Sequence, residues 1–328
     1  MVFQLLSYRI CFSTFSDSIV KNTLLTSNCS HKKYPHTILK LNKGIFPENT
    51  YFLFFISIIY IYIYMLYLQG TIGYTIFINS VTRKKIIVFA DMHDKLPPCP
   101  FPNSIKISKW FNKKFKTAKL LLEEVVRVEN MKLEALWDAS EHTNDLKLLF
   151  LNNQNEIEAI DIRPYLIPYS WETVKQSKDK NMLLRDYFKN IIIFLNLEND
   201  FLKNQIKFFN QKISDHLKTI QIKFMRFLIK NKHLLGKSII YVFNNNQNIL
   251  EDYNTLLNDC MEWYTCLLIE KYKNKTVMIH AGLYHTEKIN SLLKNYYKYE
   301  IIYKEGINFL VESRRSNYIC QPINGDII

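Results

Sequence analysis

The feature that most limits the fold of this chain is the alternation of short apolar runs with longer amphipathic segments from Thr71 onward. Apolar runs with the length of β-strands lie at 71–78, 85–90, 118–125, 157–162, 238–243, 276–280 and 300–303. Segments with helical periodicity lie at 104–116, 142–151, 256–272 and 285–296, with Ser104 as a candidate N-cap of the first. This order is typical of α/β proteins, so we predict a mostly parallel sheet flanked by helices, with a hairpin formed by the first two runs.

A second helical region interrupts this alternation. Residues 179–237 contain no proline and no glycine before Gly236, and apolar side chains recur on one helical face at Leu184, Phe188, Ile191 and Leu195. Since one helix of that length is improbable in a globular domain, we predict two long helices that break near 197–200. Residues 65–328 are therefore predicted to form a single α/β domain with a helical hairpin inserted at about 179–237.

The N-terminal residues 1–64 leave three interpretations open. Residues 51–68 form an uncharged run of 18 residues, which is the minimum length for a transmembrane helix, but five of them are tyrosine and part of the run alternates with period two. The extension is thus disordered, spurious, or the carrier of a membrane anchor at 51–68. The location follows from this choice: cytoplasmic if translation starts near Met65, and membrane-associated if the anchor is real.

Composition excludes several classes of protein. With 48% hydrophobic and 22% charged residues, the chain is neither disordered nor collagen-like. Its net charge of +13 suggests nucleic-acid binding through the Lys-rich region 179–237. Basic side chains are interleaved with acidic ones there, however, and the sequence has no nucleic-acid-binding motif, so this function ranks last. The six cysteines lack zinc-site or paired spacing, and we predict free, mostly buried thiols in a reducing compartment.

Polar side chains gather where four predicted strands end. Parallel sheets place their binding sites at the carboxyl ends of the strands. The residues at those ends are Asp91, His93 and Asp94 after the first strand of this group, Glu123 and Glu124 after the second, Asp161 and Arg163 after the third, and His280, Gly282 and His285 after the last. We expect these side chains to lie close together.

Imidazole and carboxylate groups at one edge of a sheet suit two kinds of chemistry. They can bind a divalent metal that activates water, or a histidine held by a carboxylate can act as general base without metal. Arg163 would stabilise developing negative charge, and Gly282 would let a ligand approach the backbone closely. Because side chains alternate along a strand, only one of Glu123 and Glu124 should face the site, and we favour Glu123. The structural alternative is that the histidines are ordinary hydrogen-bonded residues and that Asp161 and Arg163 merely pair with each other or with neighbours.

The same residues resemble a known superfamily. Ala90-Asp91-Met92-His93 after an early strand, the acid at 123 or 124, and Gly282-Leu283-Tyr284-His285 before a helix are similar to motifs of the erythromycin esterase-like, ChaN-like and TraB/Tiki proteins. Ala90 departs from the glycine that is usual in the first motif. Over residues 70 to 305, the resemblance implies a hydrolase-like α/β core with long helical inserts. It further implies metal-dependent proteolysis in the Tiki branch, a His/Glu-activated water in the esterase branch, or haem-iron binding in the ChaN branch.

We therefore predict a hydrolase of ester or amide bonds that acts through activated water on a small-molecule or peptide substrate. The predicted catalytic residues are His93, Glu123, Arg163 and His285, with His280 and Asp161 as supporting or alternative ligands. If a divalent metal such as Mn, Co or Zn takes part, its predicted ligands are Asp91, His93, Glu123 and His285. The alternative is a catalytically silent binding or scaffold protein on the same fold, with membrane tethering through 51–68 left open.

Overall fold

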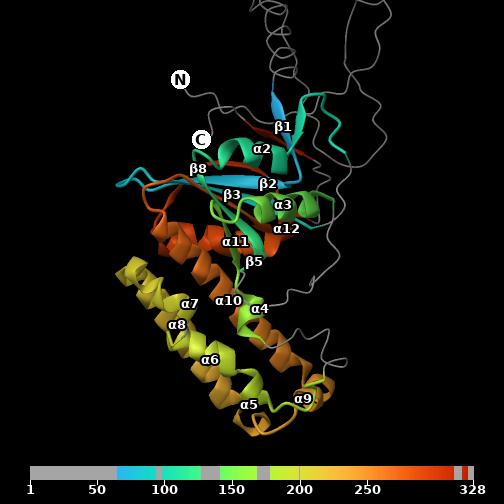
Figure 1. The fold of residues 1–328 in the computed structure, drawn as a ribbon, viewed down its shortest axis with the longest axis vertical. Helices are drawn as coiled ribbons and strands as arrows, with labels where there is room; N and C mark the ends of the chain where they lie inside the picture. Colours follow the sequence, from blue (N-terminus) through green and yellow to red (C-terminus); the bar gives the residue numbers. More distant parts are fainter. Residues whose placement is uncertain are drawn as a thin grey trace, which may run out of the picture. The chain divides into compact units, whose positions relative to one another are not determined.

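A six-stranded β-sheet lies at the centre of the protein in this computed structural model (Figure 1). The structure describes residues 65–93, 98–126, 141–167, 178–198, 200–313 and 320–323, all within one compact unit, Ile61–Ile328. The strand order is β6-β5-β7-β3-β2-β8, with bounds β2 (Gly73–Ile78), β3 (Lys85–Asp91), β5 (Lys119–Val125), β6 (Ile157–Asp161), β7 (Val277–Gly282) and β8 (Glu300–Gly306). The strands from β6 to β3 are parallel, whereas β2 is antiparallel to both neighbours. The predicted α/β fold and the β2–β3 hairpin are confirmed.

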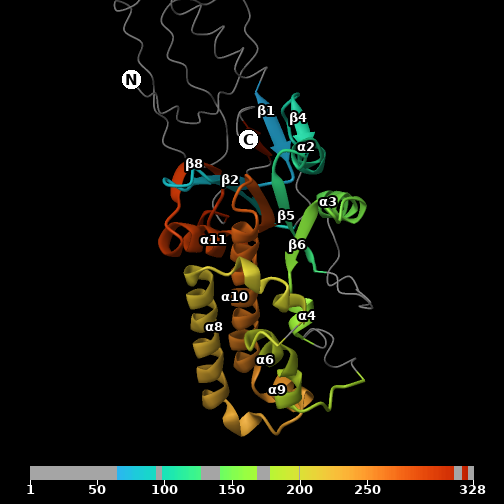
Figure 2. The ribbon, with the colours of Figure 1, turned by 60° about the vertical axis from the view of Figure 1, so that its left-hand side comes forward.

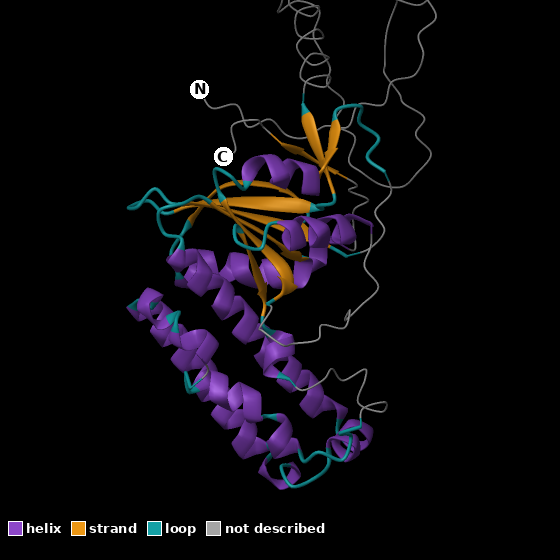
Figure 3. Cartoon of the chain, viewed as in Figure 1, coloured by secondary structure: helices purple, strands orange, loops and turns teal. Residues whose placement is uncertain are grey.

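Helices cover both faces of this sheet (Figure 3). Helices α2 (Ile107–Lys114) and α3 (Glu141–Asn152) lie on one face. Helix α11 (Leu283–Ser291), which continues into a π-helical turn at Leu292–Tyr296, lies on the other. Apolar packing joins the layers: the ring of Phe89 on β3 lies 5.6 Å from Trp110 and 5.3 Å from Phe111 on α2, measured between ring centroids. Burial of such aromatic side chains is the main stabilising contribution of the core.

A second sheet has three strands, in the order β4-β1-β9. Its strands are β1 (Leu66–Gln69), β4 (Ser104–Lys106) and β9 (Cys320–Ile323). Strand β1 contains the end of the apolar run 51–68, so this part of the predicted membrane anchor is extended chain. Residues 1–64, which include most of that run, lie outside the described residues. In the part of the chain that the structure describes, no helix has the length and apolar character needed to cross a membrane.

Strand β4 also corrects the predicted start of helix α2. Ser104 was expected to be the N-cap of a helix, but it pairs with Tyr67 of β1 in a parallel ladder. The helix begins at Ile107, and its N-cap residue, Lys106, forms no side-chain capping hydrogen bond. The competing strand pairing therefore outweighs the local capping preference of serine.

The same sheet carries a disulfide bond, between Cys99 and Cys320. The prediction that all cysteines are free is wrong for these two residues. They are 221 residues apart in sequence, so no spacing motif signals the bond; it depends on β9 pairing with β1. Cys260 and Cys266 are free and buried, as predicted, and burial raises the pKa of both thiols. The prediction of a reducing compartment depended on all cysteines being free. Because disulfides persist in oxidising compartments, the Cys99–Cys320 bond removes this support.

Between β6 and β7 the chain forms a helical arm, defined as α5 to α10 (Leu184–Lys271), in which α8 and α10 lie side by side (Figure 2). Its helices are α5 (Leu184–Tyr187), α6 (Lys189–Leu195), α7 (Asp200–Lys203), α8 (Gln211–Lys230), α9 (Ile239–Asn245) and α10 (Gln247–Lys271), with 3-10 turns at Ile206–Phe208 and Lys232–Leu234. The short α4 (Arg163–Leu166) precedes the arm, and α12 (Leu310–Ser313) follows β8. The break predicted near 197 is confirmed, because Leu197 has a φ of 59° and ends the run that contains α6.

The arm differs from the prediction in two respects. The first predicted long helix consists of the short helices α5 and α6. The predicted strand 238–243 is wrong: these residues belong to α9, because the Ser238 side chain caps a helix by accepting a hydrogen bond from the Tyr241 backbone N–H at 3.3 Å. A short run rich in β-branched residues is compatible with either structure, and the cap decides it. The helical insert therefore continues to the end of α10.

Candidate functional site

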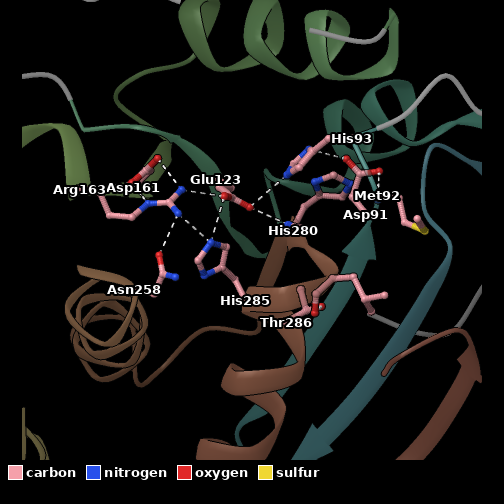
Figure 4. Close-up of polar contacts among 12 residues, drawn as sticks. Asp91, Met92, His93, Glu123, Asp161, Arg163, Asn258, His280, His285 and Thr286 are labelled. Carbon is pink, nitrogen blue, oxygen red and sulfur yellow. Dashed lines mark hydrogen bonds and ion pairs between the residues drawn. The ribbon is translucent and has the colours of Figure 1, made fainter. Parts of the chain in front are cut away.

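The predicted site residues come together at the carboxyl ends of four neighbouring parallel strands (Figure 4). Strand β3 ends at Asp91, with His93 two residues later, and β5 carries Glu123. Strand β6 ends at Asp161, with Arg163 opening α4, and β7 ends at Gly282, with His285 in the first turn of α11. The parallel order β6-β5-β7-β3 places Glu123 in the middle of this set. The structure thus places the predicted catalytic residues in one polar network.

His93 lies between two carboxylates. Its Nδ1 is 3.0 Å from Oδ2 of Asp91, and its Nε2 is 3.5 Å from Oε2 of Glu123. The side chain is 33% exposed, whereas Asp91 is fully buried. The backbone of His93 has a φ of 57°, a left-handed conformation that is uncommon for a residue other than glycine. Such conformations cluster at functional sites, where the surrounding structure holds them in place.

Glu123 is the centre of the network. Its Oε2 accepts a 2.6 Å hydrogen bond from the Gly282 backbone N–H, and its Oε1 accepts one from Nη2 of Arg163 at 3.1 Å. The side chain is only 5% exposed. Burial alone would raise the pKa of Glu123, but the hydrogen bond from His93 and the positive charges nearby lower it to about 2. Glu123 is therefore a carboxylate at neutral pH.

Arg163 uses all five of its N–H donors within the protein. Nε and one N–H of Nη2 donate to the two carboxylate oxygens of Asp161, at 2.8 and 2.9 Å. The second N–H of Nη2 donates to Glu123, and the two of Nη1 donate to Oδ1 of Asn258 and to Nε2 of His285, at 3.1 and 3.0 Å. Asp161 and Arg163 thus pair with each other and with neighbours, as the structural alternative expects. Direct donation to a substrate oxygen would require Arg163 to release one of these partners.

The two histidines on or after β7 are buried. His285 contacts Arg163 through Nε2, and its Nδ1 lies 3.3 Å from Oε1 of Glu262 on α10. His280 has its Nε2 at 3.2 Å from the Gly70 carbonyl oxygen and its ring edge-on to Phe111. His93, with 33% of its side chain exposed, is the most accessible of these three histidines.

A β-bulge corrects one prediction about β5. The register between β5 and β6 shifts between Leu122 and Val125, so β5 has one extra residue at 123–124. Alternation no longer applies there, and both Glu123 and Glu124 line the same small pocket, in contrast to the expectation that only one would. The other residues that line it are Asp91, His93, Leu122, Thr143, Leu146 and His280.

The pKa of His93 predicts a specific pH dependence of stability. Burial alone would lower this pKa, but hydrogen bonding to Asp91 and Glu123 and their charges raise it from 6.5 to about 10. The stability contributed by the imidazolium is therefore fully present below about pH 6.5 and is lost as the pH rises through about 10. We expect the difference in free energy of unfolding between wild type and His93→Asn, measured by urea denaturation, to shrink over this range. The variant His233→Asn, at an exposed position, serves as the control, and a difference that is constant with pH contradicts the expectation.

The predicted metal ligands are placed unfavourably for a divalent cation. Among the residues that the structure describes, no group of three or more His, Cys, Asp or Glu side chains is arranged to hold a metal ion. Glu123 and His285 instead face the guanidinium of Arg163, whose fixed positive charge would repel a cation. A Mn, Co or Zn ion held by all four predicted ligands would have to displace Arg163 from Glu123 and His285.

Sequence patterns did not indicate two members of the network, Asn258 and Glu262. Both lie on α10, one helical turn apart, and are 8% and 3% exposed. The signal that could have indicated them is a polar pair four residues apart in a largely apolar helical segment, which the structure extends from the predicted 256–272 to Gln247–Lys271. The backbone N–H of Gly282, a residue predicted to allow close approach of a ligand, donates a hydrogen bond to Oε2 of Glu123.

No protein-family model, curated protein or solved structure matches this chain. The resemblance to the erythromycin esterase-like, ChaN-like and TraB/Tiki superfamily therefore stays a prediction.

Proposed function

We propose that this protein hydrolyses an ester or amide bond at the site around His93, without a metal ion. The observation that carries the proposal is the position of His93: at 33% exposure, against 18% for Arg163, it is more exposed than its charged neighbours, and it is held by Asp91 on one side and by Glu123 on the other. A histidine fixed by carboxylates at the edge of a pocket is the usual arrangement of a general acid–base catalyst.

The protonation states support acid catalysis as the first role of His93. With a pKa of about 10, the imidazole is protonated at neutral pH. It would donate its Nε2 proton to the leaving oxygen or nitrogen as water attacks the carbonyl carbon. The attacking water would then return one proton to the His93–Glu123 pair, so protons balance over the cycle. Arg163, saturated with protein partners, would stabilise the negative charge of Glu123 rather than contact the substrate.

The proposal is tested with alkyl esters and peptide p-nitroanilides, whose leaving groups need a proton, after the full-length protein is dialysed against EDTA. We expect hydrolysis that survives chelation and falls about 10²-fold in His93→Asn, because general acid–base catalysis contributes at least that much. His233→Asn, at an exposed position, should retain the wild-type rate. Hydrolysis that appears only with added Mn²⁺, Co²⁺ or Zn²⁺ would contradict the metal-independent proposal.

One observation favours the second candidate, a catalytically silent binding or scaffold protein. Arg163 and Glu123 are satisfied by protein groups, as in a network that serves stability alone. The same assay distinguishes the two functions: folded protein that hydrolyses none of these substrates supports the silent alternative. A small-molecule or peptide ligand stays the predicted partner in both cases.

A further inference from the structure

Helix α10 of the helical arm brings two polar side chains into the site. Asn258 and Glu262 are four residues apart, so they share one face of α10, and that face meets Arg163 and His285. Figure 4 shows Asn258 beside Arg163 and His285. Both side chains are more than nine-tenths buried, so their polar atoms depend on protein partners. The arm is thus in direct contact with the network of the sheet.

The contact with Arg163 determines which nitrogen of His285 carries the proton. A guanidinium can only donate hydrogen bonds, so Nε2 of His285, 3.0 Å from Nη1, has to accept. The proton of the neutral ring then lies on Nδ1, which faces Oε1 of Glu262 at 3.3 Å. Glu262 accepts through this oxygen whether its carboxyl group is ionised or protonated. The network therefore assigns one tautomer to His285, with Glu262 as the acceptor that completes it.

We infer that Glu262 is a positioning residue that holds His285 in the Nδ1–H tautomer, which makes the helical arm a working part of the site. Its effect on turnover rests on the function proposed above, whereas its effect on the tautomer does not. If the acceptor at 262 is lost, the Nε2–H tautomer becomes accessible, and this tautomer points a donor at Arg163. Two facing donors repel each other, so the contact between Nη1 of Arg163 and Nε2 of His285 would be lost.

A series of substitutions at position 262 distinguishes a role of Glu262 in positioning His285 from a general role in the stability of the fold. Glu262→Gln keeps an oxygen acceptor but cannot ionise, and Glu262→Ala has no acceptor. Glu251→Gln changes an exposed residue of the same helix and serves as the matched control. The readout is two-dimensional ¹H–¹⁵N NMR of the full-length protein labelled with ¹⁵N-histidine, which distinguishes the tautomers directly. The His285 signals are assigned by their loss in His285→Asn.

We expect the Nδ1–H tautomer of His285 in wild type and in Glu251→Gln. Glu262→Ala should show the Nε2–H tautomer or a mixture, and its kcat should fall about 10- to 100-fold with KM little changed. Glu262→Gln should restore part of the Nδ1–H tautomer and part of kcat. An Nε2–H tautomer in wild type, or an unchanged tautomer in Glu262→Ala, would overturn the inference. If wild type hydrolyses no substrate, the proposed function fails, and the tautomers still decide the role of Glu262. If Glu262→Ala does not fold, the wild-type and Glu262→Gln spectra decide it.

Discussion

Replacing Glu123 by glutamine is expected to lower the free energy of unfolding by about 3–5 kcal/mol, the usual cost of removing one partner from a buried ion pair. The carboxylate faces two positive groups, with Nη2 of Arg163 at 3.1 Å and Nε2 of His93 at 3.5 Å. A neutral amide cannot compensate either charge, and its NH₂ group would face one of these donors or the Gly282 N–H. We also expect hydrolysis to be lost, because the His93 proton would no longer have its partner.

Urea denaturation followed by circular dichroism measures the stability change. The matched control is Asp252→Asn, which removes the partner of Lys230 from an exposed ion pair with a similar distance of 3.0 Å. Exposed pairs contribute about 0–1 kcal/mol, so this variant should resemble wild type. Equal effects of the two substitutions would mean that burial does not strengthen the network, contrary to the geometry.

The edge of the sheet that carries the site was predictable from sequence because two local signals agree there. Apolar runs such as 85–90 and 157–162 end in polar residues, and parallel strands place their carboxyl ends at one edge. The juxtaposition of His93, Glu123 and Arg163 follows from these two facts. Which of these side chains touch depends in addition on the strand order β6-β5-β7-β3, which places Glu123 between the others and was not predicted from sequence.

The rest of the site depends on long-range packing that leaves no local pattern. The bulge at 123–124 arises from the pairing of β5 with β6, and single-strand alternation cannot show it. Asn258 and Glu262 reach Arg163 and His285 only because α10 returns from the arm to the sheet. The disulfide likewise depends on β9 pairing with β1 across the length of the domain.

Local signals also compete with one another, and the structure shows which ones win. The run 238–243 has the composition of a strand, yet the cap at Ser238 starts a helix. Ser104 is a good helix cap by type, yet it pairs with β1 as a strand. In both places the secondary structure depends on which hydrogen-bond partners the backbone N–H and C=O groups find, and composition alone does not determine these partners.

Gly282→Ala should damage the site while leaving the fold largely intact. A Cβ atom at this position would lie 2.8 Å from Nε2 and 3.3 Å from Cδ2 of His93, and 3.4 Å from Oε2 of Glu123. Because the closest atom is at the far end of a side chain, His93 can move aside, and overpacking should cost no more than about 1–3 kcal/mol. The displacement separates His93 from Glu123, so we expect the pKa of His93 to fall and hydrolysis to drop about 10²-fold.

NMR titration of His93 and the ester assay measure the two effects, and Gly236→Ala provides the matched control. A Cβ atom at 236 meets nothing within 4 Å, so this variant should keep wild-type activity and stability. The comparison isolates the close approach of His93 to the end of β7 from the general cost of replacing a glycine. If Gly282→Ala titrates and hydrolyses like wild type, the contact between His93 and Glu123 is not what sets the protonation of His93. Acid catalysis by this histidine would then lose its structural basis, because only that contact and the one with Asp91 raise the pKa above its ordinary value.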